Sequence, residues 1–95
     1  MFTQEEIDTF AKSTFHMTIG IQTDDTENNI NLIKKSWSQL STTTKEYIEN
    51  FLNREVETHN RITANPEYNN SLMTNLGNEE NAQKWIDLLS WMNSI

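Results

Sequence analysis

Apolar residues recur every three or four positions along most of this chain, a spacing that places them on one face of an α-helix. The pattern predicts helices over 4–18, 25–40, 44–64 and 66–76, and a last helix that opens at Asn78. With two Gly and one Pro, the chain has too few turn-forming residues for a sandwich or barrel. We expect one all-α domain over residues 1–95, a small bundle of four to five helices with no sheet. The open point is whether 66–76 forms a full helix.

Polar residues at the predicted helix starts support these boundaries. In a capping box, a Thr, Ser or Asp and a Glu three positions later each accept a backbone N–H of the other. Three pairs have this spacing: Thr3 with Glu6, Asp24 with Glu27, and Thr43 with Glu46. Phe2 and Ile7 flank the first box as a hydrophobic staple. The Asn65–Pro66 pair ends the third helix, because the residue before a proline is excluded from helical geometry.

The apolar faces of these helices predict the core. A helix that covers a single core buries one stripe and leaves polar residues opposite. The expected core members are Ile7, Phe10, Phe15, Ile30, Ile33, Trp37, Leu40, Ile48, Phe51, Leu52, Leu72, Trp85, Ile86 and Leu89.

The last predicted helix has more apolar positions than one stripe holds. Beside its core stripe, a second set of residues at three-to-four spacing comprises Leu88, Trp91 and Ile95. Either this helix is central in the bundle, or the second stripe contacts another chain. Trp is enriched in interface hot spots, and we expect a contact surface for the partner or for a second copy, in a homodimer through the C-terminal helix.

The charge balance restricts the partners. Fourteen Asp and Glu against seven Lys and Arg give a net charge of −7, which opposes direct binding to nucleic acid or to an anionic membrane. No apolar run reaches membrane-spanning length, and the first residues lack the pattern of a signal peptide. We expect a cytoplasmic protein whose acidic surface attracts a partner protein with a basic surface.

Several acidic residues are candidates for that contact. If the second and third helices align, their carboxylates can stand for the phosphates of a nucleic acid in a basic groove, although lysines and arginines interrupt them. The residues concerned are Asp24, Asp25, Glu27, Glu46, Glu49 and Glu57.

The sequence offers little chemistry for catalysis. Zero cysteines exclude thiolate nucleophiles and cysteine-based metal sites. The two histidines, His16 and His59, match no metal-binding motif, and Glu55 with His59 is an ordinary i,i+4 helix pair. Paired carboxylates lie at helix starts, where capping and the helix dipole explain them. We therefore expect no enzyme, no metal and no cofactor.

Two classes of function remain. The first is a non-enzymatic acidic protein-binding module that occupies a partner's surface, of the inhibitor, immunity or anti-defence type, with the nucleic-acid mimic as one form. The alternative is a small-ligand-binding bundle or an adaptor or regulatory subunit. Its ligand would lie in the core near Phe15, His16, Trp37 and Tyr47.

Overall fold

The structure, a computed structural model, describes residues 1–20, 24–65, 67 and 74–95. This part of the chain holds four α-helices and one short 3₁₀ helix: α1 (Gln4–Thr18), α2 (Thr26–Ser36), η1 (Trp37–Gln39), α3 (Thr42–Thr63) and α4 (Glu79–Ser94). The β-structure of the described residues is limited to an isolated bridge between Thr74 and Gly77. The predicted all-α bundle is confirmed.

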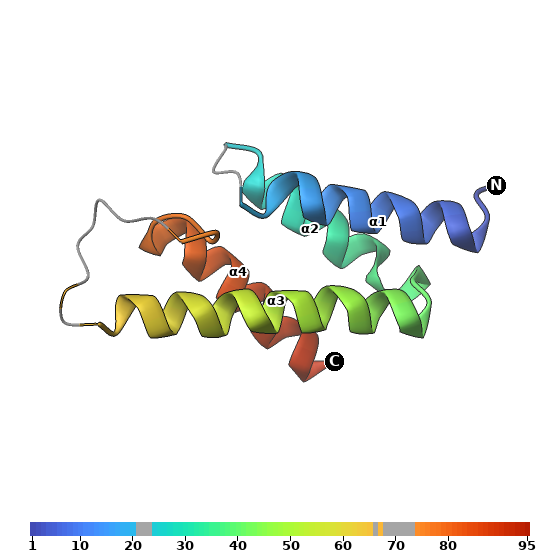
Figure 1. The fold of residues 1–95 in the computed structure, drawn as a ribbon. Coiled ribbons are helices and arrows are strands. Elements are labelled where there is room, and N and C mark those ends of the chain that lie inside the picture. The colour runs from blue at the N-terminus through green and yellow to red at the C-terminus, as the bar shows by residue number, and fades with distance from the viewer. Residues whose placement is uncertain (21–23, 66, 68–73) are drawn as a thin grey trace.

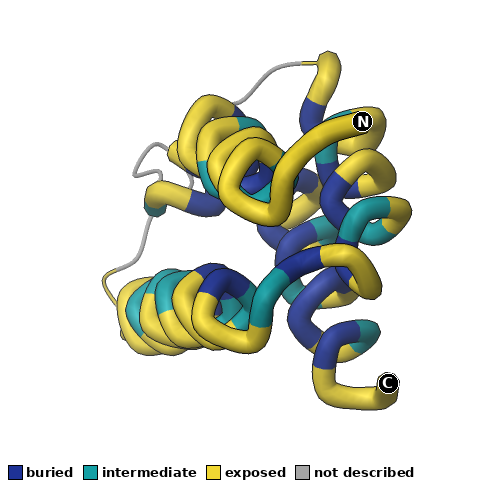
Figure 2. Tube along the Cα trace, turned by 90° about the vertical axis from the view of Figure 1, so that its right-hand side faces the viewer, coloured by how far each residue is buried: buried dark blue, intermediate teal, exposed yellow. Residues whose placement is uncertain are grey.

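The helices run up and down the bundle in chain order (Figure 1). The packed pairs are α1 with α2, α1 with α3, α2 with α4, and α3 with α4. Helices α2 and α3 therefore lie diagonally across the bundle. The buried sides of all four helices face one another, whereas residues 4–6 at the start of α1 are exposed (Figure 2).

The first capping box forms as predicted. The Glu6 backbone N–H donates to Thr3 Oγ1 and the Thr3 N–H donates to Glu6 Oε1, each over 3.1 Å. The other two predicted caps are wrong. Helix α2 follows Asp25 rather than Asp24, and α3 follows Ser41, whose hydroxyl accepts the Thr44 N–H over 3.2 Å.

A tertiary contact explains why α3 begins two residues before the predicted start. The Asp8 carboxylate on α1 accepts hydrogen bonds from both the N–H and the hydroxyl of Ser41, over 3.0 and 2.7 Å. This pair of bonds fixes Ser41 as the cap. Sequence spacing alone favoured Thr43, because it lies three residues before a glutamate.

The helix predicted over 25–40 ends at Ser36 and tightens into η1. The Ser36 hydroxyl donates to the carbonyl of Leu32 over 3.0 Å, a backward bond that bends helices. Trp37 and Leu40 remain buried. Trp37 and Leu40 therefore belong to the core as predicted, although the α-helix ends before them.

The helix predicted over 66–76 is tested only at its end, because residues 66 and 68–73, with Leu72 among them, lie outside the described residues. Thr74–Gly77 forms a turn, closed by a 2.9 Å bond from the Gly77 N–H to the Thr74 carbonyl. Gly77 has a φ of +83°, a conformation that glycine adopts without steric cost. The prediction is therefore wrong for this part of the segment.

Most of the predicted core is confirmed. Nine of the expected members are buried, namely Phe15, Ile30, Ile33, Trp37, Leu40, Ile48, Leu52, Trp85 and Leu89. Ile7, Phe51 and Ile86 are partly buried and pack against the core. The prediction for Phe10 is wrong, because its side chain is 58% exposed. At about 100° per residue, Phe10 lies about 120° around the helix from the midpoint between the buried Ala11 and Phe15.

Candidate functional site

The most distinctive surface feature is an apolar groove between the start of α1 and the end of α2 with η1. Its volume is about 690 Å³, and its lining comprises Phe2, Glu5, Glu6, Ile7, Thr9, Phe10, Ser36 and Gln39. We call it the Phe2–Phe10 groove. Phe2 is 75% exposed and Phe10 58% exposed. Two large aromatic side chains thus stay in water at one end of a small protein.

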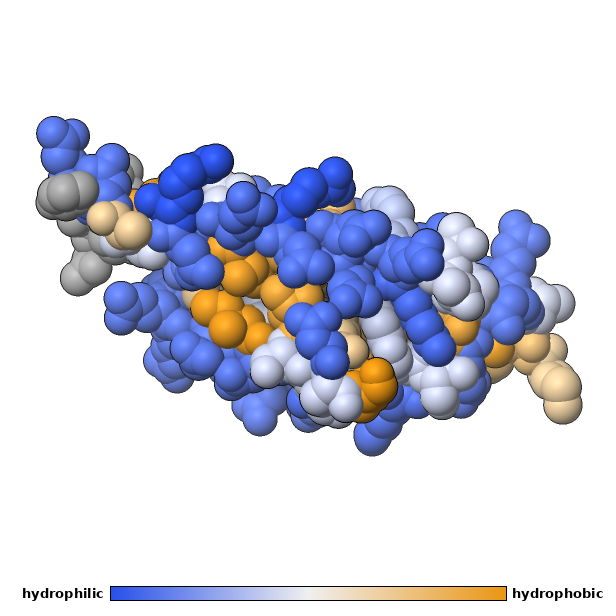
Figure 3. All heavy atoms as spheres, turned by 90° about the horizontal axis from the view of Figure 1, so that it is seen from below, coloured by the Kyte–Doolittle hydropathy of each residue, from blue (hydrophilic) through white to orange (hydrophobic). Residues whose placement is uncertain are grey.

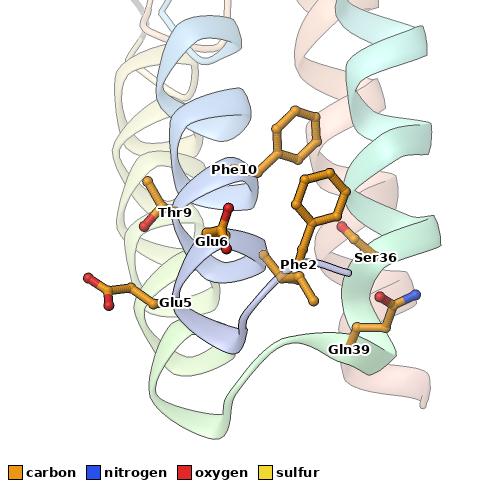
Figure 4. A pocket seen from close by; sticks show the side chains of 8 residues that line it. Phe2, Glu5, Glu6, Thr9, Phe10, Ser36 and Gln39 are labelled. Carbon is orange, nitrogen blue, oxygen red and sulfur yellow. The ribbon is translucent and has the colours of Figure 1, made fainter.

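The side chains of the groove come from Phe2 just before α1, from α1 itself, and from the end of α2 with η1 (Figure 4). The rings of Phe2 and Phe10 lie side by side and face the strip of α2 and η1 that carries Ser36 and Gln39. Glu6 lies beside the rings, and Glu5 projects from the outer side of the same turn. The floor is apolar, and the two charged residues in the lining are both carboxylates.

Hydrogen bonds fix the two walls of the groove relative to each other. The Gln4 side chain on α1 donates to the Gln39 carbonyl of η1 over 2.8 Å. The same amide group donates to Asp8 over 2.9 Å, and Asp8 in turn holds Ser41. These bonds connect the start of α1 to η1 and to the start of α3 at one end of the groove.

Asp8 is the titratable group of this region with a displaced pKa. The hydrogen bonds from the Ser41 hydroxyl and N–H lower the pKa of Asp8 from 3.8 to about 2, with Gln4 and Thr44 adding to the effect. Asp8 is thus ionised near neutral pH and stabilises the junction between α1 and α3. It has a structural role at the end of the groove and is absent from its lining.

The three residues of the second stripe of the last helix differ in their burial. Leu88 is fully buried in the core, so the prediction that it contacts another chain is wrong. The reason is that α4 packs against both α2 and α3 and buries two sides. Trp91 is partly buried, with its ring 6.3 Å from that of Trp37 and the Lys34 Nζ 5.7 Å from its centroid. Ile95 is 68% exposed.

The predicted acidic residues lie on the surface but not on one packed pair of helices. Asp24, Asp25 and Glu27 are exposed at the start of α2, whereas Glu46 and Glu57 are exposed on α3. Glu49, also on α3, is partly buried. Because α2 and α3 lie diagonally in the bundle, the alignment that the phosphate array requires is not formed.

The residues of the predicted core ligand site do not enclose a cavity together. His16 and Tyr47 are exposed and hydrogen-bonded to each other over 2.8 Å, and Phe15 packs beneath His16 with ring centroids 5.4 Å apart. Trp37 instead packs against Trp91. The structure brings three of the four residues into one aromatic cluster, in which Phe15 is buried and His16 and Tyr47 are exposed.

The expected pairing of Glu55 with His59 is replaced by two longer-range contacts. Glu55 accepts a 3.1 Å hydrogen bond from the Asn75 side chain, and the His59 Nδ1 lies 2.5 Å from Thr74 Oγ1. His59 is buried. Both residues therefore anchor the turn at Thr74–Gly77 to α3.

The described residues hold neither a cluster of metal ligands nor a membrane-spanning helix. None of their histidine, aspartate and glutamate side chains gather in threes that could hold a metal ion. In the described ranges, every helix is too short or too polar to cross a membrane.

Apolar atoms are also visible on the face that carries α3 and the end of α4 (Figure 3). They lie between hydrophilic side chains in the middle of this face, and further apolar atoms project at the end that carries the N-terminus. The described exposed large hydrophobic residues of α3 and α4 are Tyr47, Ile62 and Ile95, which are 44%, 38% and 68% exposed. Of these, Tyr47 is the aromatic residue, and it is hydrogen-bonded to His16 over 2.8 Å.

No protein family, curated protein or solved structure that was compared with this chain matches it. The site is therefore interpreted from its own geometry.

Sequence reasoning assigned the groove residues to other roles. Phe2 and Ile7 were expected as a hydrophobic staple, and Phe10 as a core residue. The position of a residue around the helix axis distinguishes the groove residues from core residues. The buried face of α1 is already occupied by Ala11, Phe15 and Thr18. An aromatic residue outside this face has no helix to cover it.

Proposed function

We propose that this chain is a non-enzymatic protein-binding module and that the Phe2–Phe10 groove is its docking surface. The observation that carries the proposal is the exposure of two phenylalanines, Phe2 and Phe10, in one groove. Exposing large apolar side chains to water is unfavourable by about 25 cal/mol per Å². A contiguous apolar patch on a small protein is typical of a surface that a partner covers.

The proposal moves the expected contact from the C-terminal helix to the first helix. Burial of Leu88 and the packing of Trp91 on Trp37 leave Ile95 as the well-exposed member of the second stripe. One exposed aliphatic residue is common on protein surfaces. The groove offers Phe2 and Phe10 with walls on two helices.

An open groove suits a protein partner better than a small molecule. Pockets for small ligands bury most of the ligand surface, whereas Phe2 and Phe10 are more than half exposed. A module of this kind works by occupying its partner, as a cytoplasmic inhibitor, immunity or anti-defence factor does. Neither histidine lines the groove, which fits a non-enzymatic role.

A selection of peptide binders from a library with no charge bias tests this function. We expect selected binders to compete with one another and to lose affinity at least about tenfold for the Phe2→Ser/Phe10→Ser variant, which corresponds to about 1.4 kcal/mol. Met17→Ser is the matched control, because Met17 is 72% exposed on the same helix and lies outside the groove lining. Binders unaffected by the double substitution would place the docking surface elsewhere.

A further inference from the structure

The composition of the Phe2–Phe10 groove also restricts what can occupy it. Its floor is apolar, with Phe2, Ile7 and Phe10 as the large side chains. Its charged residues are Glu5 and Glu6 on the first turn of α1, where Glu6 lies beside the rings and Glu5 projects from the outer side of the turn. An occupant must therefore present apolar side chains to the floor and tolerate carboxylates beside them.

The groove is not a site for an anion, although it adjoins the start of a helix. The free N–H groups at a helix start attract negative charge. Here the Glu6 N–H donates to Thr3 Oγ1, and the Thr3 N–H donates to Glu6 Oε1. The capping box thus satisfies two of these donors internally, and Glu5 adds another negative charge at the same turn.

Charge also disfavours a second copy of this chain as the occupant. A two-fold interface through the groove would place Glu5 and Glu6 of both copies in one contact region. Like charges facing each other in a partly dehydrated contact are repulsive. The net charge of −7 adds long-range repulsion between copies. The same charge opposes an anionic membrane surface.

The form of the groove favours a helical occupant. Its walls are the sides of α1 and of α2 with η1. A hollow between two helices accepts an amphipathic helix, whose residues at i, i+3, i+4 and i+7 insert as a row. Addition of a strand would require an open sheet edge, and the described residues contain only the isolated bridge at Thr74 and Gly77.

We infer that the Phe2–Phe10 groove binds an amphipathic helix of a partner protein, with an apolar face over Phe2 and Phe10 and Lys or Arg residues beside Glu5 and Glu6. The inference rests on the docking function proposed above and adds the chemistry of the partner. Apolar contacts supply most of the affinity. The carboxylates select basic partners and raise the association rate.

Three designed peptides of about 15 residues, the length of α1, test the inference by fluorescence anisotropy. All three carry the same Leu and Phe face, and their flanking residues are Lys, Gln or Glu. We expect the Lys peptide to bind with a Kd of about 10 μM or tighter, the Gln peptide more weakly by about tenfold, and the Glu peptide not measurably.

Two variants separate the apolar contribution from that of charge. Phe10→Ser should weaken the Lys and Gln peptides alike, whereas Met17→Ser should weaken neither. Glu5→Gln/Glu6→Gln should weaken the Lys peptide about tenfold and leave the Gln peptide unchanged. Glutamine at position 6 keeps the side-chain oxygen that caps α1, because Glu and Gln serve equally in a capping box.

The outcomes distinguish the inference from the function on which it rests. Equal binding of all three peptides, lost in Phe10→Ser, would overturn the basic-helix inference and leave the docking groove standing. If no peptide binds, the helical partner class is overturned, and the library selection decides separately whether the groove docks another kind of partner. Concentration-dependent dimerisation that Phe10→Ser abolishes would identify a second copy as the occupant and contradict the inference.

Discussion

The Asp8 carboxylate accepts two hydrogen bonds from Ser41, one from its backbone N–H over 3.0 Å and one from its hydroxyl over 2.7 Å. Ser41 is the N-cap of α3, and Asp8 lies on α1. A residue of the first helix thus fixes where the third helix begins. The same contact keeps the first turns of α1 beside η1, where they form a wall of the groove.

This relationship predicts a specific dependence of stability on pH. The Ser41 hydrogen bonds lower the pKa of Asp8 to about 2, below its usual 3.8. The stabilising contribution is therefore fully present above about pH 4 and is lost as the pH falls through 2. In Asp8→Asn, the free energy of unfolding should be lower at pH 7 and should change less than that of the wild type between pH 4 and 2.

Urea unfolding followed by circular dichroism at a series of pH values measures this effect. Asp87→Asn is the control, because Asp87 accepts a hydrogen bond from Gln83 within its own helix. The free energy of unfolding of Asp87→Asn should change with pH between 4 and 2 as that of the wild type does. Identical pH profiles for Asp8→Asn and the wild type would contradict the assignment.

Trp37 connects η1 to the last helix, and its removal should be costly. Its side chain is 6% exposed, and its ring lies 6.3 Å from that of Trp91. Trp37→Ala should lower the free energy of unfolding by about 3–5 kcal/mol, as for other aromatic truncations in cores. Trp91→Ala should lower the free energy of unfolding by less, because Trp91 is only partly buried. Unchanged stability in Trp37→Ala, measured by urea unfolding, would show that the stripe of α2 was misinterpreted.

Leu88 and Ile95 should respond differently, although both belong to the second stripe of the last helix. Leu88 is fully buried, and Leu88→Ala should cost about 2–5 kcal/mol. Ile95 is 68% exposed, and Ile95→Ser should change stability by less than about 0.5 kcal/mol. Sedimentation of both variants checks association at the same time. A Leu88→Ala variant that stays stable but alters self-association would restore the interface interpretation.

The buried His59 depends on Thr74 for its hydrogen bond. Thr74 Oγ1 also accepts the Leu76 N–H over 3.2 Å, so one hydroxyl connects α3 to the turn before α4. Thr74→Val keeps the shape of the side chain but removes the hydroxyl. It should lower the free energy of unfolding by about 1–3 kcal/mol. Thr63→Val is the control, because Thr63 bonds only carbonyls of its own helix. Equal stability of the two variants in urea unfolding would contradict this role.

The local pattern predicted the helices because the interactions that form them lie within a few residues. The Thr3–Glu6 capping box and the stripe that contains Ile30 and Ile33 are of this kind. The start of α3 was missed because Asp8, thirty-three residues before Ser41, determines it. Caps that depend on tertiary contacts have no signature in local spacing.

The candidate site was not predicted, because it depends on which apolar residues lack a covering helix. The periodic pattern predicts Phe10 and Phe15 alike as core residues. In the structure Phe10 is 58% exposed and Phe15 is fully buried. The difference arises from the packing of α1 against α2 and α3. Leu88 illustrates the converse: an apparent surplus residue became core because α4 has two packed neighbours.

Mapping the bound Lys-flanked peptide on the protein by amide chemical shifts tests the central claim most directly. We expect the largest shifts at Phe2, Glu6 and Phe10 and at Ser36–Gln39, the two walls of the groove. The same map for Met17→Ser should be unchanged, and for Phe10→Ser the shifts should be lost at equal peptide concentration. Shifts concentrated at the end of α4, around Trp91 and Ile95, would contradict the assignment of the docking surface to the groove.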